Sequence, residues 1–302
     1  MKFRFFARRV GRCLATLCLW SGLTIEAQAQ SQPAADRVAG QVLDQGTRAP
    51  LPYASVGVLG RSVGTVADEQ GRFDLVVPTQ YDADSLRISL VGYRPFTTTV
   101  RDFRRRTCPA ESLCPVGLTA AAQTALGEVV VRPQGRAVRR VLGNSSNSSF
   151  ASQLFDSNAL GNQIGQYIRI KRTSMLEQVS FHVNKCTYDS LFYRVNVYRL
   201  GPDGHPDEQR NVLPAAVYVG VAKAQTTGRI RVDLSRYQVW LDPGQDVAVC
   251  LELVRDLGPG ALYLTATVLG GPLFVKEGGV TEKWDKVGGF GMGIDATVTE
   301  IR

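Results

Sequence analysis

The sequence contains few of the residues from which metal and catalytic centres are usually built. It has only two histidines: His182, in a run of alternating apolar residues, and His205, in a loop rich in proline and glycine. A zinc peptidase of the H-E-x-x-H type needs two histidines one helical turn apart, with a glutamate beside the first. That pattern is absent, and we expect no metal ligands and no cofactor.

Other chemistries are excluded on similar grounds. No lysine lies between Ala34 and Pro133, so this region lacks the nucleophile of a Lys–Asn isopeptide bond. Neither phosphate-binding glycine pattern, G-x-x-x-x-G-K-[ST] or G-x-G-x-x-G before a helix, occurs. Gly60 to Gly64 match G-x-S-x-G, but a nucleophile elbow joins a strand to a helix, and strand-type residues flank this segment on both sides. We therefore interpret it as a hairpin turn and predict no catalytic residues and no enzymatic activity.

Long apolar runs are also scarce. Residues 1–29 combine a basic head, a short apolar stretch and an Ala27-Gln28-Ala29 ending, which is typical of a secretory signal peptide. We predict export to the periplasm or outer membrane, or secretion, with no transmembrane helix in the mature chain. The net charge of +8 falls to +4 without the signal, because that segment holds five basic residues and one acid. Such a mild charge gives no support for binding nucleic acid.

Four cysteines follow the signal segment: Cys108, Cys114, Cys186 and Cys250. An even number in an exported chain permits disulfides. Cys108 and Cys114 flank a short loop that a disulfide can close, and Cys186 and Cys250 can join two neighbouring strands.

The hydrophobic pattern is that of an all-β protein. Short runs with a period of two recur between turn residues, as at Val179–Val183 and Val247–Leu253, and this alternation indicates strands with one face on a core and one in water. We predict two antiparallel β-sandwich domains, the first of transthyretin or immunoglobulin type and the second similar to a jelly roll.

The most specific pattern lies in residues 37–93. It reads VAGQVLD from Val38, PLPYASV from Pro50, GTVADEQGRF from Gly64 and ISLVGY from Ile88. These segments resemble the carboxypeptidase-regulatory-like (transthyretin-like) domain of Bacteroidetes envelope proteins. The resemblance implies a scaffold that precedes another domain and implies no chemistry of its own. Within it, we expect Asp68 to accept backbone N–H bonds in a turn that ends at Gly71.

The domain boundaries follow from these features. We predict a signal peptide at 1–29, the regulatory-like sandwich at 36–132, a polar linker at 133–149 and the second sandwich at 150–302. The linker assignment depends on the basic and Ser/Asn-rich composition of that segment. The segments SLFYRVNVY from Ser190 and VDLSRY from Val232 more weakly resemble a C-terminal β-sandwich found behind this domain in Bacteroidetes proteins, which implies a fold and no activity for 150–302.

Two functions remain open at this point. In the first, the protein is a non-enzymatic envelope accessory module that docks other envelope proteins. In the second, it is a carbohydrate-binding module in which Trp284, in a polar loop, stacks on a sugar while Lys283 and Asp285 bond its hydroxyls. The expected partners are therefore envelope proteins or glycans.

Overall fold

A computed structural model describes residues 36–106, 108, 113–121, 135–148, 152–155, 160–276 and 283–302. The predicted signal peptide lies outside these residues, as do residues 122–134 at the end of the first predicted domain and the start of the predicted linker. The chain from Ala34 to Arg302 forms one compact unit. Within the described residues, no helix has the length and apolar character needed to cross a membrane.

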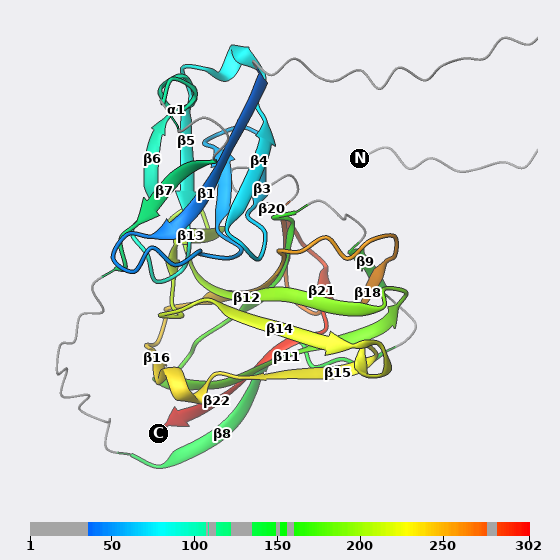
Figure 1. Ribbon diagram of the computed structural model, residues 1–302. Coiled ribbons are helices and arrows are strands. Elements are labelled where there is room, and N and C mark those ends of the chain that lie inside the picture. The colour runs from blue at the N-terminus through cyan, green and yellow to red at the C-terminus, as the bar shows by residue number, and fades with distance from the viewer. Residues whose placement is uncertain are drawn as a thin grey trace, which may run out of the picture. The chain divides into compact units, whose positions relative to one another are not determined.

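The first sandwich consists of two small sheets. The three-stranded sheet has the order β4-β1-β7, and the four-stranded sheet has the order β3-β2-β5-β6. Their bounds are β1 (Arg37–Asp44), β2 (Ser55–Val58), β3 (Gly64–Val66), β4 (Arg72–Val76), β5 (Ser85–Ser89), β6 (Phe96–Thr99) and β7 (Cys114–Leu118). A short helix, α1 (Val100–Arg104), follows β6. The predicted sandwich is confirmed, although β1 and β7, which lie side by side in Figure 1, are parallel.

The local chemistry of this sandwich follows its sequence. Leu86 and Ile88 of β5 are fully buried, whereas Arg87 between them points to the other face of the sheet. In the turn before β4, Asp68 accepts bonds from the backbone N–H groups of Gln70 and Arg72, and Gly71 takes a left-handed φ of 71°. The predicted Asp68–Gly71 turn is confirmed, and the G-x-S-x-G segment is the connection between antiparallel strands β2 and β3.

The second sandwich has larger sheets. One has the order β13-β12-β17-β10-β19-β20, with β14 also paired to β12; we call it the seven-stranded sheet. Its strands are β10 (Gln163–Ile168), β12 (Ser190–Leu200), β13 (Pro206–Asn211), β14 (Val217–Ala222), β17 (Val247–Leu253), β19 (Leu273–Lys276) and β20 (Asp285–Val287).

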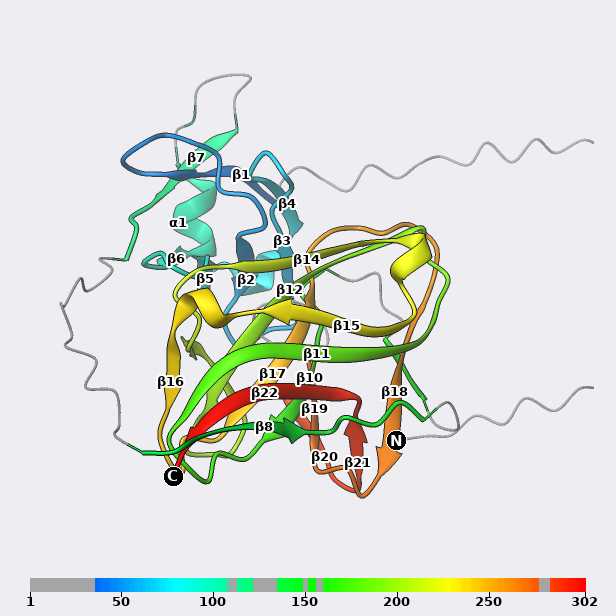
Figure 2. The same ribbon diagram turned by 90° about the horizontal axis from the view of Figure 1, so that it is seen from below.

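The opposing sheet has eight strands and is built around a long central strand, β11 (Ser174–Cys186), that pairs with β15, β16, β18 and β22. Figure 2 shows β22 between β11 and β8. The other members are β8 (Ala137–Gly143), β9 (Ser152–Phe155), β15 (Gly228–Asp233), β16 (Val239–Leu241), β18 (Leu262–Val268), β21 (Phe290–Met292) and β22 (Ile294–Ile301). A large apolar cluster, which includes Phe181, Tyr193 and Leu251, fills the space between the two sheets.

The predicted polar linker is wrong for part of its length. Residues 137–143 form β8, which pairs along its whole length with β22. The polar residues after it are also bound to this sandwich, since Asn144 donates to Thr267 Oγ1 and the Ser146 carbonyl accepts from Thr265. The prediction failed because β8 is an edge strand with little burial, and its arginines resemble those of a solvated loop.

Candidate binding site on the covered sheet face

The seven-stranded sheet is covered on both faces. Every residue of β17 is buried, including Glu252, although its alternation predicted a face in water. The outward face carries a row of polar residues that are cross-strand neighbours: Arg194 pairs in register with Glu252, Glu252 with Gln163, and Gln163 with Lys276. We call these four residues the polar row. All four are buried, so they need partners within the protein.

Arg194 and Glu252 form the centre of the polar row. Arg194 Nε donates to Glu252 Oε2 at 2.9 Å and Nη2 donates to Oε1 at 2.6 Å, a two-point contact between side chains that are 4% and 3% exposed. The remaining Arg194 bonds reach the first sandwich: Nη1 donates to the Tyr53 carbonyl at 2.9 Å, and Nη2 to Ser55 Oγ at 2.6 Å. Arg194 therefore links the two sandwiches through its own hydrogen bonds.

Aromatic residues reinforce this link. The Tyr53 ring lies 5.1 Å from the ring centroids of both Phe192 and Tyr218. Arg255 stacks over Phe192 at 4.4 Å and pairs with Glu69 of the first sandwich at 3.3 Å. Tyr53 itself has a φ of 59°, a left-handed backbone rarely adopted by a bulky residue. The segment around Tyr53 is thus held in an uncommon conformation at the contact between the sandwiches.

A second set of polar bonds surrounds the ion pair. Asn196 Nδ2 donates to Glu252 Oε2 at 2.7 Å, and its own Oδ1 accepts from Asn211 Nδ2 at 3.0 Å. Gln163 Oε1 accepts from the Tyr198 hydroxyl at 3.2 Å. Strands β10, β12, β13 and β17 therefore hold these amides in fixed orientations.

Two adjoining cavities open beside this network. The first, of about 310 Å³, is lined from both sandwiches, and the second, of about 480 Å³, is lined chiefly by the segment 201–209. They share Leu59, Arg87, Glu208 and Gln209. We call the two together the groove. Its lining combines amides and charged groups with apolar side chains such as Leu59 and Pro95, and convergent polar groups in a concave site can orient a ligand.

Arg87 and Glu208 stand where the two cavities meet, in different environments. Glu208 pairs with Lys276, whose side chain is fully buried; burial raises the pKa of Glu208, while the Lys276 ammonium opposes that shift. Arg87 is half-buried, and its Nε atom is buried without a hydrogen-bond partner. Among the described residues, none forms an ion pair with Arg87.

The predicted sugar-binding residues Lys283, Trp284 and Asp285 do not come together around a common cavity. Trp284 is 8% exposed and packs edge-on against Tyr198 and Phe274, so its ring is not the exposed platform that the hypothesis requires. It lines the second cavity, whereas Lys283 and Asp285 are exposed and do not line the groove. The fold brings Trp284 onto the covered face of the seven-stranded sheet, where an aromatic side chain is drawn into the apolar packing.

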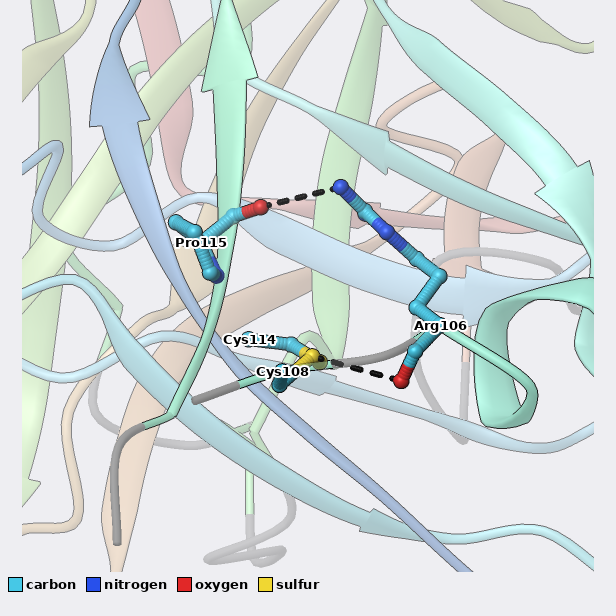
Figure 3. Close-up of a disulfide and its surroundings, with 4 residues drawn as sticks. All are labelled: Arg106, Cys108, Cys114 and Pro115. Atoms are coloured by element: carbon cyan, nitrogen blue, oxygen red, sulfur yellow. Dashed lines mark hydrogen bonds between the residues drawn. A yellow bond between two sulfur atoms is a disulfide. The ribbon is translucent and has the colours of Figure 1, made fainter. Parts of the chain in front are cut away.

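Two of the four predicted disulfide cysteines are bonded and two are free. Cys108 and Cys114 form a disulfide, and Figure 3 shows it beside Arg106, which donates to the Pro115 carbonyl. Cys186 and Cys250 are free. The suggested bond between them does not form because β11 and β17 belong to opposite sheets.

The histidines lie apart from each other. His182 is buried on β11, with its Nε2 3.8 Å from Asp295 Oδ2, and Asp295 is paired with Arg229. Burial, together with Arg229, lowers the pKa of His182. His205 lies by the second cavity, 3.3 Å from Asp203. Within the described part of the chain, no three His, Cys, Asp or Glu residues gather around a position that could hold a metal ion.

Sequence reasoning did not identify Arg87, Arg194, Glu252 or Glu208. The alternation of their strands indicated a solvated face for Arg87, Arg194 and Glu252, and no strand was predicted around Glu208. The covering contact between sandwiches is not encoded in that alternation. The available signal was the presence of Arg194, Asn196 and Glu252 at outward positions of otherwise strongly apolar strands.

Comparison with known proteins supports the assignment of the first sandwich. Residues 38–131 match the family model described as the CarboxypepD_reg-like domain. No curated protein matches the chain. Among solved structures, the VP2 subviral particle of infectious bursal disease virus is similar over 88% of this chain, with 12% sequence identity and a TM-score of 0.19. This chain spans 55% of that chain's length, and a likeness of this size supports no inference about function. The chain therefore contains a carboxypeptidase-regulatory-like domain, at residues 38–131.

Proposed function

We propose that this protein is a non-catalytic, exported accessory protein of the bacterial cell envelope that binds a ligand in the groove. The observation that carries the proposal is that both sandwiches line the first cavity, with Ser55, Arg87 and Ser89 on one side and Asn196 and Glu252 on the other. In this proposal the regulatory-like domain is one wall of a binding site, and its attachment through Arg194 keeps that wall in place.

The contacts support binding as the role of these residues. Arg194 and Glu252 satisfy each other and the neighbouring backbone, so their hydrogen-bonding capacity is used to build the site. Asn196, Asn211 and Gln163 are similarly oriented by mutual bonds. Fixed polar groups around a preformed cavity lower the cost of ordering on binding.

Export is supported by two independent features. The basic and apolar pattern of residues 1–29 is that of a signal peptide. The Cys108–Cys114 disulfide belongs to chemistry that persists in oxidising compartments, outside the cytosol. A Bacteroidetes envelope is the setting that the regulatory-like domain suggests.

Filling the first cavity tests the binding proposal. Ser89 lines it and Ser62 is an exposed turn residue of the same sandwich, so Ser89→Phe and Ser62→Phe form a matched pair. Saturation-transfer NMR against a panel of soluble oligosaccharides and short peptides should find a ligand whose signal is lost in Ser89→Phe and kept in Ser62→Phe. Equal binding by both folded variants, or no binding from the whole panel, contradicts the proposal.

Fractionation of cells that express the full chain tests the localisation. We expect the protein in the periplasmic or outer-membrane fraction or the medium, with a new N-terminus at Gln30. An unprocessed chain in the cytosol contradicts export without affecting the binding test.

A further inference from the structure

We infer that the groove takes a carbohydrate carrying a single carboxylate, bound by Arg87. The inference rests on the proposed function, because it assigns a ligand class to the same groove. It starts from the unsatisfied charge of Arg87, which stands where the two cavities meet.

In the described part of the chain, four charged side chains line the first cavity, and all but Arg87 are neutralised by an ion pair. Arg194 is paired with Glu252, and Glu208 is paired with Lys276. The guanidinium of Arg87 has no such partner among the described residues, and its buried Nε lacks a hydrogen bond. A half-buried guanidinium without an ion-pair partner fits a carboxylate, which accepts charge-assisted N–H bonds from it.

The second cavity sets a limit on the ligand's charge. Asp203, Asp207 and Glu208 line it, against His205 and Arg87. A hydrogen bond from the His205 backbone, and the nearby His205 ring, lower the pKa of Asp203, which keeps that group ionised. A second carboxylate in this cavity would meet like charge. The ligand therefore carries one acid, placed at Arg87, and a neutral remainder.

The rest of the lining indicates that this remainder is rich in hydroxyl groups. Asn211 and Gln209 present amides, and Ser89 presents a hydroxyl. Amides and carboxylates together offer both donors and acceptors, which matches the dual character of sugar hydroxyls. The groove also has apolar side chains in its lining, among them Leu59, Pro95 and Trp284, so a short peptide is the competing ligand that the experiment must include.

The two adjoining cavities favour a ligand longer than one sugar. The first provides about 310 Å³ and the second about 480 Å³, and Arg87 contributes to both. We therefore expect a short oligosaccharide in which one uronic acid lies at Arg87 and neutral sugars extend into the second cavity.

The test uses the mature protein and four soluble probes. They are an aldotriouronic acid, which has one uronate and two neutral sugars; its carboxyl-reduced neutral form; trigalacturonate, with an acid on every sugar; and an N-acetylated tripeptide with a free C-terminal carboxylate. Titration calorimetry should show tightest binding for the aldotriouronic acid. Loss of the carboxylate should weaken binding about ten- to a hundredfold, the range for a charge-assisted contact.

Arg87→Gln should weaken binding of the aldotriouronic acid by a similar factor and leave binding of the neutral form unchanged. Arg87→Lys should retain part of the affinity for the acid. Arg72→Gln removes an exposed arginine from the other sheet of the same sandwich and should change neither. Melting curves of each variant establish that it is folded.

The outcomes distinguish the single-carboxylate inference from the proposal that the groove binds a ligand. If the neutral form binds as tightly as the acid and Arg87→Gln has no effect, the groove is a binding site but the single-carboxylate inference is wrong. Tighter binding of trigalacturonate or of the tripeptide also overturns it. If no probe binds and the Ser89→Phe comparison finds no ligand either, the proposed function fails as well.

Discussion

The outer faces of the two sheets in the second sandwich carry the same kind of charged pair in opposite environments. On the seven-stranded sheet, Arg194 and Glu252 have side chains that are 4% and 3% exposed. On the other sheet, Arg139 pairs with Glu177 at 2.9 Å, but Arg139 is 67% exposed. In both cases the charged residues stand at positions for which the sequence predicts contact with water, so the sequence alone does not say which face another domain covers.

The difference arises from what lies above each face. Arg194 reaches the Tyr53 carbonyl and Ser55 Oγ of the first sandwich, and it loses its water in doing so. Arg139 keeps its water because β8 is an edge strand with little burial. An ion pair in water contributes little to stability, whereas removing one partner of a buried pair leaves the other charge without compensation.

Removal of Arg194 should have the largest effect. Arg194→Ala leaves Glu252 buried and unpaired, and we expect the free energy of unfolding to fall by about 3–5 kcal/mol. Urea denaturation followed by tryptophan fluorescence measures it. A loss of less than about 1 kcal/mol would mean that the covered face is as well hydrated as the exposed one.

Opening the disulfide should have a smaller effect and should act on the covering domain. The bond closes a loop with a sequence separation of 6, and the chain-entropy estimate for so short a loop is about 2 kcal/mol. We expect Cys108→Ser to lower the free energy of unfolding by that amount, in the same denaturation assay. Cys186→Ser, which removes a free thiol, is the control, and an equal loss in both variants would show that the disulfide adds nothing.

The two free cysteines report directly on burial. Cys250 is fully buried on the covered face, and burial raises its pKa well above the usual value, so little thiolate forms near neutral pH. Cys186 is only half-buried. Labelling with Ellman's reagent should modify Cys186 at least about tenfold faster, and Cys250 should react only as the protein opens. Equal rates in native protein would indicate that the covered face is accessible.

Removal of the exposed arginine should have the smallest effect. Arg139→Ala should lower the free energy of unfolding by about 0.2–1 kcal/mol, with most of that loss disappearing at high salt. Denaturation at low and high ionic strength checks it. A cost that equals that of Arg194→Ala would remove the contrast between the two faces.

Much of the fold could be predicted from the sequence, and the reason is local. Alternating residues in segments such as β5 and β17 specify strands, and Asp68 with Gly71 specifies a turn. The segment 137–143 could not be predicted as a strand, because an edge strand that buries little apolar surface shows no hydrophobic alternation. The helix α1 was not predicted either, since its five residues are too few to show helical periodicity.

The candidate site could not be predicted, because its residues come from strands far apart in the sequence. Arg87 and Ser89 belong to β5, whereas Asn196 belongs to β12 and Glu252 to β17. The polar neighbours of Trp284 predict a loop in which its ring can stack on a sugar, but the fold buries the ring against Tyr198 and Phe274.

The sequence by itself determined the β-rich character of the protein, the regulatory-like domain and the turn chemistry within it. Only the tertiary structure decided that Arg194 and Glu252 are buried and that Arg87 is left without a partner beside a cavity. The physical reason is that strand periodicity separates two faces of a sheet, while the surroundings of each face depend on contacts between distant parts of the chain.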